Sequence, residues 1–229
     1  MCPAGGLVTA LERLERMSEE EWLGGSYPHA MLEFLAGRAS PRKLRLLACC
    51  CCREPSVERL LNRADSLVSA AERFAEGTGT REELLLAAQG TPKPRVSGGS
   101  WSSWNSVRLP LSSQAQAAVF CLTAEEAWEA ASGVLRTATN LLGTTPCDRI
   151  REIFGNPFCE ITIAPDWRTT EVVRLACEIE ATGGFDRVPE LEETLQRAGC
   201  DDERLLSHCR DRTVHVRGCW AVDLLTGKR

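Results

Sequence analysis

The sequence lacks any apolar run that approaches the length of a membrane-spanning helix, which takes about 18 or more consecutive apolar residues. Its first residues, MCPAGGLVTALERLERM, carry charges where a secretory signal peptide has its apolar stretch. Both absences predict a cytoplasmic protein that does not act at a membrane. With 229 residues, 43% of them hydrophobic, the chain is long enough to fold as an ordinary globular protein.

An excess of positive charge is missing as well. The formal net charge is -5, so the protein as a whole does not attract nucleic acid, and such binding would need a local basic patch. Runs of charge are usually solvated faces. Nucleic acid is therefore a less favoured partner. The basic residues available for a patch are Arg42, Lys43, Arg45, Arg210, Arg212 and Arg217.

Catalytic motifs are absent too: the sequence has no hydrolase nucleophile elbow, no phosphate-binding loop and no zinc-protease motif. Acidic clusters at residues 19–21 and 201–203 stand at predicted helix starts. There each carboxylate stabilises the helix dipole by roughly 0.5 kcal/mol, which explains the clusters without chemistry. We assign no catalytic residue and expect a non-enzymatic protein.

Helix signals dominate what is present. Ser18 and Thr80 each begin a capping box, with a glutamate three residues later, and Ser40-Pro41 is an N-cap followed by proline at the first helical position. The β-branched run at 161–163 predicts at most a very short strand or an extended connector. We predict an all-α protein, an irregular bundle of about eight to ten short helices.

Composition changes abruptly at residues 90–113, which are rich in glycine, proline and serine and have no period. This segment predicts a long loop or linker between an N-terminal helical part, 17–89, and a C-terminal helical part, 114–229, and we expect the two parts to pack as one domain. Residues 1–16 are expected to be a variable extension.

Two tryptophans in the loop, Trp101 and Trp104, favour a protein partner, because exposed tryptophans are common interface hot spots. The alternative is that both rings pack back on the domain and hold the loop down. The tryptophans on or beside apolar helical segments, for which we predict core packing, are Trp22, Trp128, Trp167 and Trp220.

The twelve cysteines include four in succession, residues 49–52. A reducing compartment keeps most of them as thiols. On a helix Cys51 shares a face with the apolar stripe, whereas Cys49 and Cys52, three residues apart, share a different face with Arg42 and Arg45. The pair is thus predicted to lie off the main apolar stripe.

Two thiols at this spacing can bind one tetrahedral zinc, which needs two more ligands. The segment SHCRDRTVHVRGCW, residues 207–220, offers thiols and two of the three histidines, His208 and His215. A zinc between the two regions would join the N-terminal half of the chain to the C-terminal half. The candidate metal ligands are Cys49, Cys52, Cys209, His215 and Cys219.

Two other interpretations of the cysteines stay open. Free cysteine is among the most buried residue types, so the thiols can be core packing and the histidines simply hydrogen-bonded. A thiolate or metal-dependent enzyme would pair a cysteine with an imidazole, such as His215 with Cys219, and would use Asp223 as the acid that orients the ring.

Several segments together resemble a family of uncharacterised planctomycete proteins. The resemblance covers most of residues 17–229 and brings no established activity, cofactor or catalytic residue. It implies that Met17 can be the true start, and it is weakest at Glu54-Pro55. The segments are MSEEEWLGG, MLEFLAGRASPRKLRLLACCCCR, IREIFGNPF, PDWRTTEVVRLACEI, FDRVPELEETLQRAGCDDERLLSHCR and HVRGCWAVDLLTGKR.

Overall fold

The described part of the computed structural model comprises residues 17–61, 65–91, 110–211 and 214–228. Helices are its only regular secondary structure and no strand occurs within these ranges, which confirms the predicted all-α class. The β-branched run at 161–163 is an extended connector. Residues 1–16, Trp101 and Trp104 lie outside the described residues.

The predicted helix starts are largely confirmed. Ser18 and Thr80 each form a complete capping box, and the Ser40 hydroxyl accepts a hydrogen bond from the Lys43 amide. Such caps satisfy amides that the first helical turn leaves without partners. Local sequence therefore determines where these helices begin.

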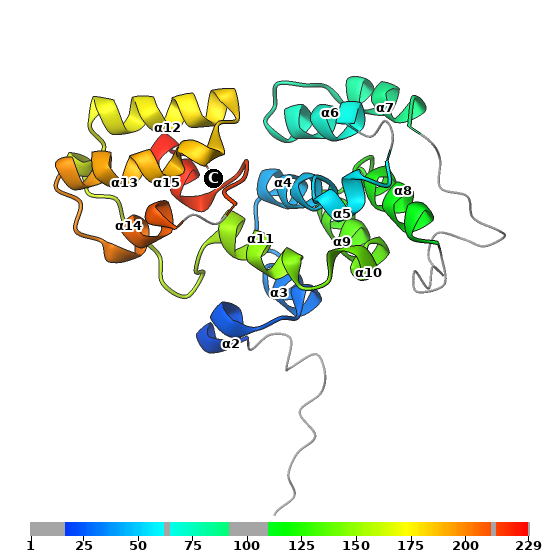
Figure 1. Cartoon of the computed structure of the whole chain (residues 1–229), viewed down its shortest axis with the longest axis horizontal. Coiled ribbons are helices and arrows are strands. Elements are labelled where there is room, and N and C mark those ends of the chain that lie inside the picture. The colour runs from blue at the N-terminus through cyan, green and yellow to red at the C-terminus, as the bar shows by residue number, and fades with distance from the viewer. Residues whose placement is uncertain (1–16, 62–64, 92–109, 212–213, 229) are drawn as a thin grey trace, which may run out of the picture.

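The helices form two groups, each around its own apolar core (Figure 1). The first group comprises α2 (Glu19–Gly24), α3 (Pro28–Phe34), α4 (Pro41–Cys52), α5 (Pro55–Glu58), α6 (Asp65–Ala75), α7 (Arg81–Gln89), α8 (Leu111–Cys121), α9 (Ala127–Thr137), α10 (Thr139–Leu142) and α11 (Thr145–Phe154). The second comprises η3 (Pro165–Trp167), α12 (Thr170–Thr182), η4 (Phe185–Arg187), α13 (Val188–Arg197), α14 (Glu203–Arg210) and α15 (Trp220–Thr226).

The boundary between the two cores does not coincide with the change in composition at residues 90–113. Buried side chains from both sides of residues 90–113 share the first core, so the helices before and after that segment pack together. The second core begins only after the connector 155–164. The connector 155–164 therefore separates the two cores, whereas the Gly/Pro/Ser-rich segment 90–113 lies between helices of the same core.

Helix α4 is the central helix of the first core and contacts α6, α8, α9 and α11. All four sulfur-bearing residues of its cysteine run, 49–52, are buried. The sequence places Cys49 and Cys52 on a face of α4 away from the main apolar stripe. Neighbouring helices cover that face as well, so both thiols are buried. Sequence periodicity shows one stripe, but it cannot show how many helices surround the segment.

The tryptophans predicted to pack in cores do so. Trp22 is fully buried in the first core, and Trp128 is half-buried against it. Trp167 and Trp220 are half-buried against the second core. Trp22 also donates from Nε1 to the carbonyl of Gly155 at 2.9 Å, which ties α2 to the end of α11.

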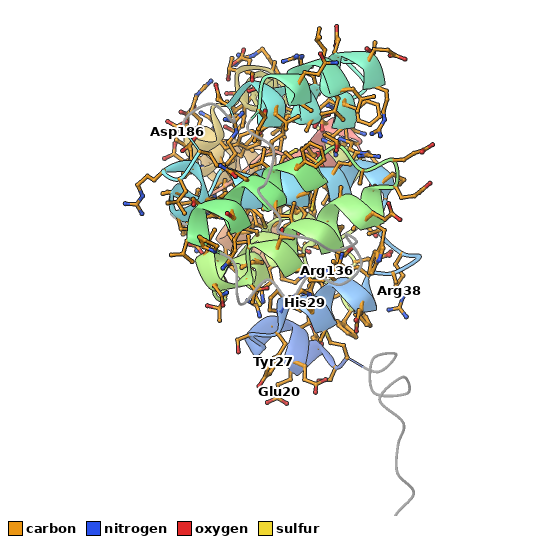
Figure 2. The ribbon with its side chains drawn as sticks, turned by 90° about the vertical axis from the view of Figure 1, so that its right-hand side faces the viewer. Glu20, Tyr27, His29, Arg38, Arg136 and Asp186 are labelled. Atoms are coloured by element: carbon orange, nitrogen blue, oxygen red, sulfur yellow. The ribbon has the colours of Figure 1, made fainter. Side chains whose placement is uncertain are left out.

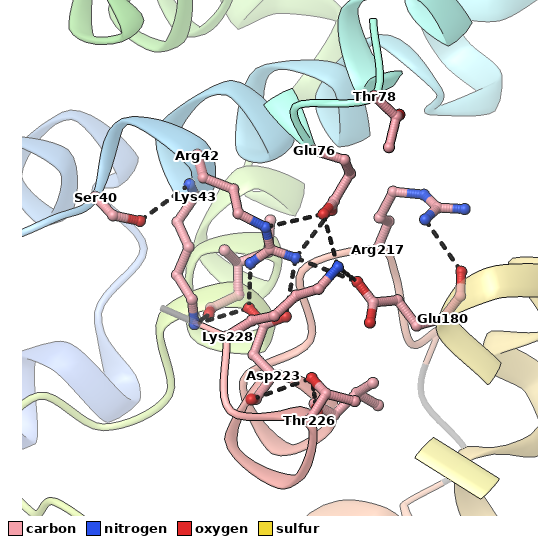
Figure 3. Close-up of polar contacts among 12 residues, drawn as sticks. Ser40, Arg42, Lys43, Glu76, Thr78, Glu180, Arg217, Asp223, Thr226 and Lys228 are labelled. Atoms are coloured by element: carbon pink, nitrogen blue, oxygen red, sulfur yellow. Dashed lines mark hydrogen bonds and ion pairs between the residues drawn. The ribbon is translucent and has the colours of Figure 1, made fainter. Parts of the chain in front are cut away.

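A network of charged side chains joins the two cores (Figure 3). Arg42 on α4 donates to Asp223 on α15 at 2.8 Å and to Glu76, just after α6, at 2.9 Å. Lys228 contacts both Glu76 and Glu180 of α12, and Lys43 lies 3.4 Å from Asp223. Three cations and three carboxylates thus balance where α4 and α6 approach α12 and α15.

Removing one charge from this network should destabilise the protein far more than breaking a surface pair. Asp223 is almost fully buried, so Asp223→Asn should lower the free energy of unfolding by about 3 kcal/mol, because Arg42 loses a buried counter-charge. Urea denaturation measures the change. Glu171→Ala, which breaks an exposed pair with Arg197, should cost less than about 1 kcal/mol. Equal losses in the two variants would contradict the role of the network.

Candidate metal centre

Four metal-ligating side chains come together at the junction of the two cores. They are Glu152, His208, His215 and Cys219, and one potential ligand atom from each lies within 4.8 Å of the others. Carboxylate, imidazole and thiolate are the ligands that zinc takes in proteins. Among the described residues this group can hold a metal ion.

Three separate segments supply these residues. Glu152 is near the end of α11 in the first group of helices, and His208 is on α14 in the second. His215 and Cys219 belong to the segment that leads into α15, and Cys219 is its N-cap residue. The site therefore depends on the junction and is not contained in any one helix.

Gly218 allows the chain to turn at this point. Its φ of +89° lies in the left-handed region, and a Cβ there would come within 3.0 Å of the Leu46 side chain on α4. A glycine is required for both reasons. The turn directs Cys219 toward His208, and it packs the segment directly against the first core.

His215 is held by hydrogen bonds at both ring nitrogens. Its Nδ1 lies 3.0 Å from Glu152 Oε1, and its Nε2 lies 3.0 Å from the carbonyl oxygen of Asp211. Because both partners are acceptors, both nitrogens carry protons in this arrangement. Burial lowers the pKa of His215, but the bond to Glu152 and its charge outweigh burial, so the pKa is raised overall.

His208 has the opposite electrostatics. Its Nδ1 accepts a hydrogen bond from Trp220 Nε1 at 3.2 Å, and its Nε2 lies 3.2 Å from Cys219 Sγ and 3.7 Å from Glu152 Oε2. Burial lowers the pKa of His208 to about 4, with His215 acting in the same direction. The ring is therefore neutral at pH 7, and its proton is on Nε2.

The thiol of Cys219 is fully buried. Burial raises its pKa well above the ordinary value, and the hydrogen bond and charge of Glu152 raise it further. Without a metal the sulfur is thus a protonated, inert thiol. A divalent cation would reverse this, because a coordinated thiol loses its proton.

Only part of the predicted ligand set is brought together. His215 and Cys219 belong to the group, but Cys49, Cys52 and Cys209 do not. Cys49 and Cys52 are enclosed by the first core, and Cys209 packs in the second, one residue past His208 and so turned away by about 100°. Burial raises the pKa of Cys209 to about 12. Cys49 and Cys52 therefore stand apart from this group, and metal binding by the α4 thiols stays a prediction.

Sequence reasoning missed Glu152 and did not include His208 in the ligand set. Glu152 lies within RIREIF, where nothing in the local pattern separates a buried glutamate from a solvated one. His208 stands one residue from Cys209, and only the phase of α14 decides which of them faces α11. The third histidine, His29, is exposed on α3 and does not belong to the group (Figure 2).

A cavity of about 1220 Å³ opens beside the metal-ligating group. Among the four group members only His208 lines it, next to Trp220; the rest of its wall includes Trp22, Lys43 and Phe154. Glu152, His215 and Cys219 are all buried behind His208. A ligand in the cavity would therefore meet the indole and one imidazole edge before any metal.

No family model matches the chain, and no curated protein or solved structure matches it. No helix in the described residues is both long and apolar enough to cross a membrane.

The pKa of His208 makes the metal-free protein sensitive to acid. The unfolded chain takes up a proton at His208 near pH 6.5, whereas the folded protein does so only near pH 4. Stability is thus lost as pH falls through this window, by up to about 3 kcal/mol. His215, with its raised pKa, acts in the opposite direction and stabilises the fold below its unfolded pKa.

Urea unfolding at pH 7.0 and about pH 4.5 in the presence of a chelator, for wild type and His208→Gln, measures the contribution of His208. We expect the stability loss on acidification to be smaller in the variant, because glutamine does not titrate. Carboxylates also titrate in this pH range, so only the difference between the two proteins reports on His208. An identical loss in both would contradict the depressed pKa.

Proposed function

We propose that the chain is a non-enzymatic, cytoplasmic helical module that binds another protein, and that a structural zinc ion fixes its two cores relative to each other. The single observation that carries the zinc proposal is the convergence of Glu152, His208, His215 and Cys219 from three segments. Four protein ligands complete a tetrahedral zinc and leave no position for a substrate, as in structural sites.

The burial of the group supports a structural role over a catalytic one. Cys219 is fully buried and Glu152 and His215 nearly so, and the cavity reaches only His208. A catalytic zinc needs an open coordination position that substrate can enter. The Cys219 thiol lies 3.2 Å from the His208 imidazole, as a cysteine nucleophile would. It is nevertheless buried and protonated, because burial raises its pKa, and this disfavours a nucleophilic role.

Five of the six basic residues considered for nucleic acid bind other groups of the protein, and the sixth, Arg212, lies outside the described residues. Arg42 and Lys43 pair with Asp223, and Arg45 donates to backbone carbonyls after α8. Near the C-terminus Arg210 pairs with Glu192, and Arg217 donates to the Glu180 carbonyl. Charges engaged in this way do not favour phosphate binding, so a protein remains the proposed partner.

The helices on either side of residues 92–109 in the sequence expose apolar side chains, which supports a protein partner. Helix α7 precedes this segment and exposes Leu85 and Leu86, and α8 follows it and begins with the exposed Leu111. These leucines flank, in the sequence, the segment that carries Trp101 and Trp104. Exposed apolar side chains next to the two tryptophans along the chain support the prediction of a protein partner.

Zinc content and stability test the metal proposal. Protein purified without a metal-affinity tag should contain one zinc per chain, and zinc at 100 times its dissociation constant should raise the free energy of unfolding by about 2.7 kcal/mol. Cys219→Ser and His215→Gln should weaken zinc binding by more than about 100-fold, since each removes a direct ligand. Elemental analysis and competition with a chelator measure both effects.

Three cysteine variants are matched controls. Cys209→Ala, Cys49→Ala and Cys52→Ala each remove a buried thiol outside the group, and we expect all three to keep one zinc per chain. Loss of zinc from the Cys49 or Cys52 variant, with Cys219→Ser unaffected, would refute the assignment.

The partner surface is tested by affinity purification with the intact protein and with Trp101→Ala/Trp104→Ala. We expect the double variant to lose a protein that the intact chain retains, because tryptophan at an interface contributes a large share of binding energy. Val214→Ala, an exposed apolar residue in the second half of the chain, is the control and should retain the same protein. Identical partner sets for all three would remove the segment from the proposal.

A further inference from the structure

We propose that Trp220 is a positioning residue that weakens zinc binding at the Glu152–His208–His215–Cys219 group, because it holds His208 in the tautomer that cannot ligate through Nε2. This inference rests on the proposed zinc site and deepens it. It names the residue that sets the affinity of the site for zinc.

The tautomer follows from which atoms can donate. An indole nitrogen is a donor only, so Trp220 Nε1–H must meet a lone pair on His208 Nδ1, 3.2 Å away. A neutral imidazole that accepts at Nδ1 carries its proton on Nε2. That proton faces Cys219 Sγ at 3.2 Å, in the position that a metal would take.

The indole is held in place by its surroundings. The rings of Trp220 and His208 have centroids 4.6 Å apart. On another side Gly155 packs against the indole, since a Cβ at Gly155 would come within 3.1 Å of Trp220 Cγ. The donor therefore cannot turn away from His208 without movement of the ring.

Metal binding through Nε2 needs a lone pair on that atom, so the proton of a neutral His208 must then lie on Nδ1. The Nδ1–H and the Trp220 Nε1–H would point at each other, and both donors would lose their partner. The indole, which Gly155 packs against and which lines the cavity together with His208, would then have to move. Metal binding and indole position are thus coupled.

His215 shows the arrangement that favours binding. Its Nε2–H can keep its bond to the Asp211 carbonyl while Nδ1 exchanges its proton for a metal. A ligating histidine usually donates its other N–H to a carbonyl or carboxylate in this way. The two histidines of one site therefore differ: the surroundings of His215 support ligation, and Trp220 opposes ligation by His208.

Chelator competition with Zn²⁺ on wild type, Trp220→Phe and Trp167→Phe tests the inference. Phenylalanine keeps an aromatic ring but removes the N–H, so Trp220→Phe should bind Zn²⁺ about 10–100-fold more tightly than wild type. Trp167→Phe changes another half-buried tryptophan of the second core and should leave the affinity unchanged.

A second readout observes the tautomer of His208 in the metal-free wild type. Long-range ¹H–¹⁵N spectra of the metal-free wild type should show His208 protonated at Nε2 and unprotonated at Nδ1. Adding Zn²⁺ should shift the Trp220 indole N–H signal, which is assigned by its absence from Trp220→Phe. A proton on Nδ1 in the metal-free protein would overturn the inference even if Trp220→Phe fails to fold.

The outcomes separate the inference from the zinc proposal. If wild type binds Zn²⁺ and Trp220→Phe binds it no more tightly, the role of Trp220 is wrong and the zinc site stands. If neither protein binds Zn²⁺, the proposed zinc function fails and the inference fails with it.

Discussion

The structure depends on polar groups that are buried where two helical cores meet. Apolar packing accounts for each core separately. The contact between the cores contains two polar pairs, Arg42 with Asp223 and Glu152 with His215, and each pair joins one core to the other. Buried charge is costly unless it is paired and hydrogen-bonded. The relative position of the cores is therefore set by the requirement that every one of these groups finds its partner.

The metal-ligating group satisfies this requirement through hydrogen bonds when no metal is bound. Its members form a chain of hydrogen bonds from the Trp220 indole through His208, Cys219 and Glu152 to His215. With a metal the same atoms would become ligands: His215 and the thiol would each lose a proton, and the proton of neutral His208 would move from Nε2 to Nδ1. Only the bond between Trp220 and His208 has no place in that arrangement, so the indole is the one partner that metal binding displaces.

Much of the fold could be predicted from sequence, because caps and apolar periodicity are local. Ser18, Ser40 and Thr80 identified helix starts that the structure confirms. The ligand set could not be predicted in full. His215 and Cys219 were found from residue type and proximity, but Glu152 has no local signal, and the phase of α14 selects His208 over Cys209.

The cysteine run shows what residue type and spacing leave open. Spacing made Cys49 and Cys52 plausible zinc ligands, and that spacing exists in the structure. Within the described residues, however, the pair does not belong to a group of three or more possible ligands, and α4 is enclosed within the first core. Burial raises the pKa of both thiols strongly, as expected of sulfur in apolar packing.

X-ray absorption spectroscopy at the zinc edge of the purified protein tests the central proposal most directly, because it counts sulfur neighbours. The Glu152, His208, His215 and Cys219 site predicts one sulfur and three nitrogen or oxygen ligands. Two or more sulfur ligands, or a protein that takes up no zinc at all, would contradict it.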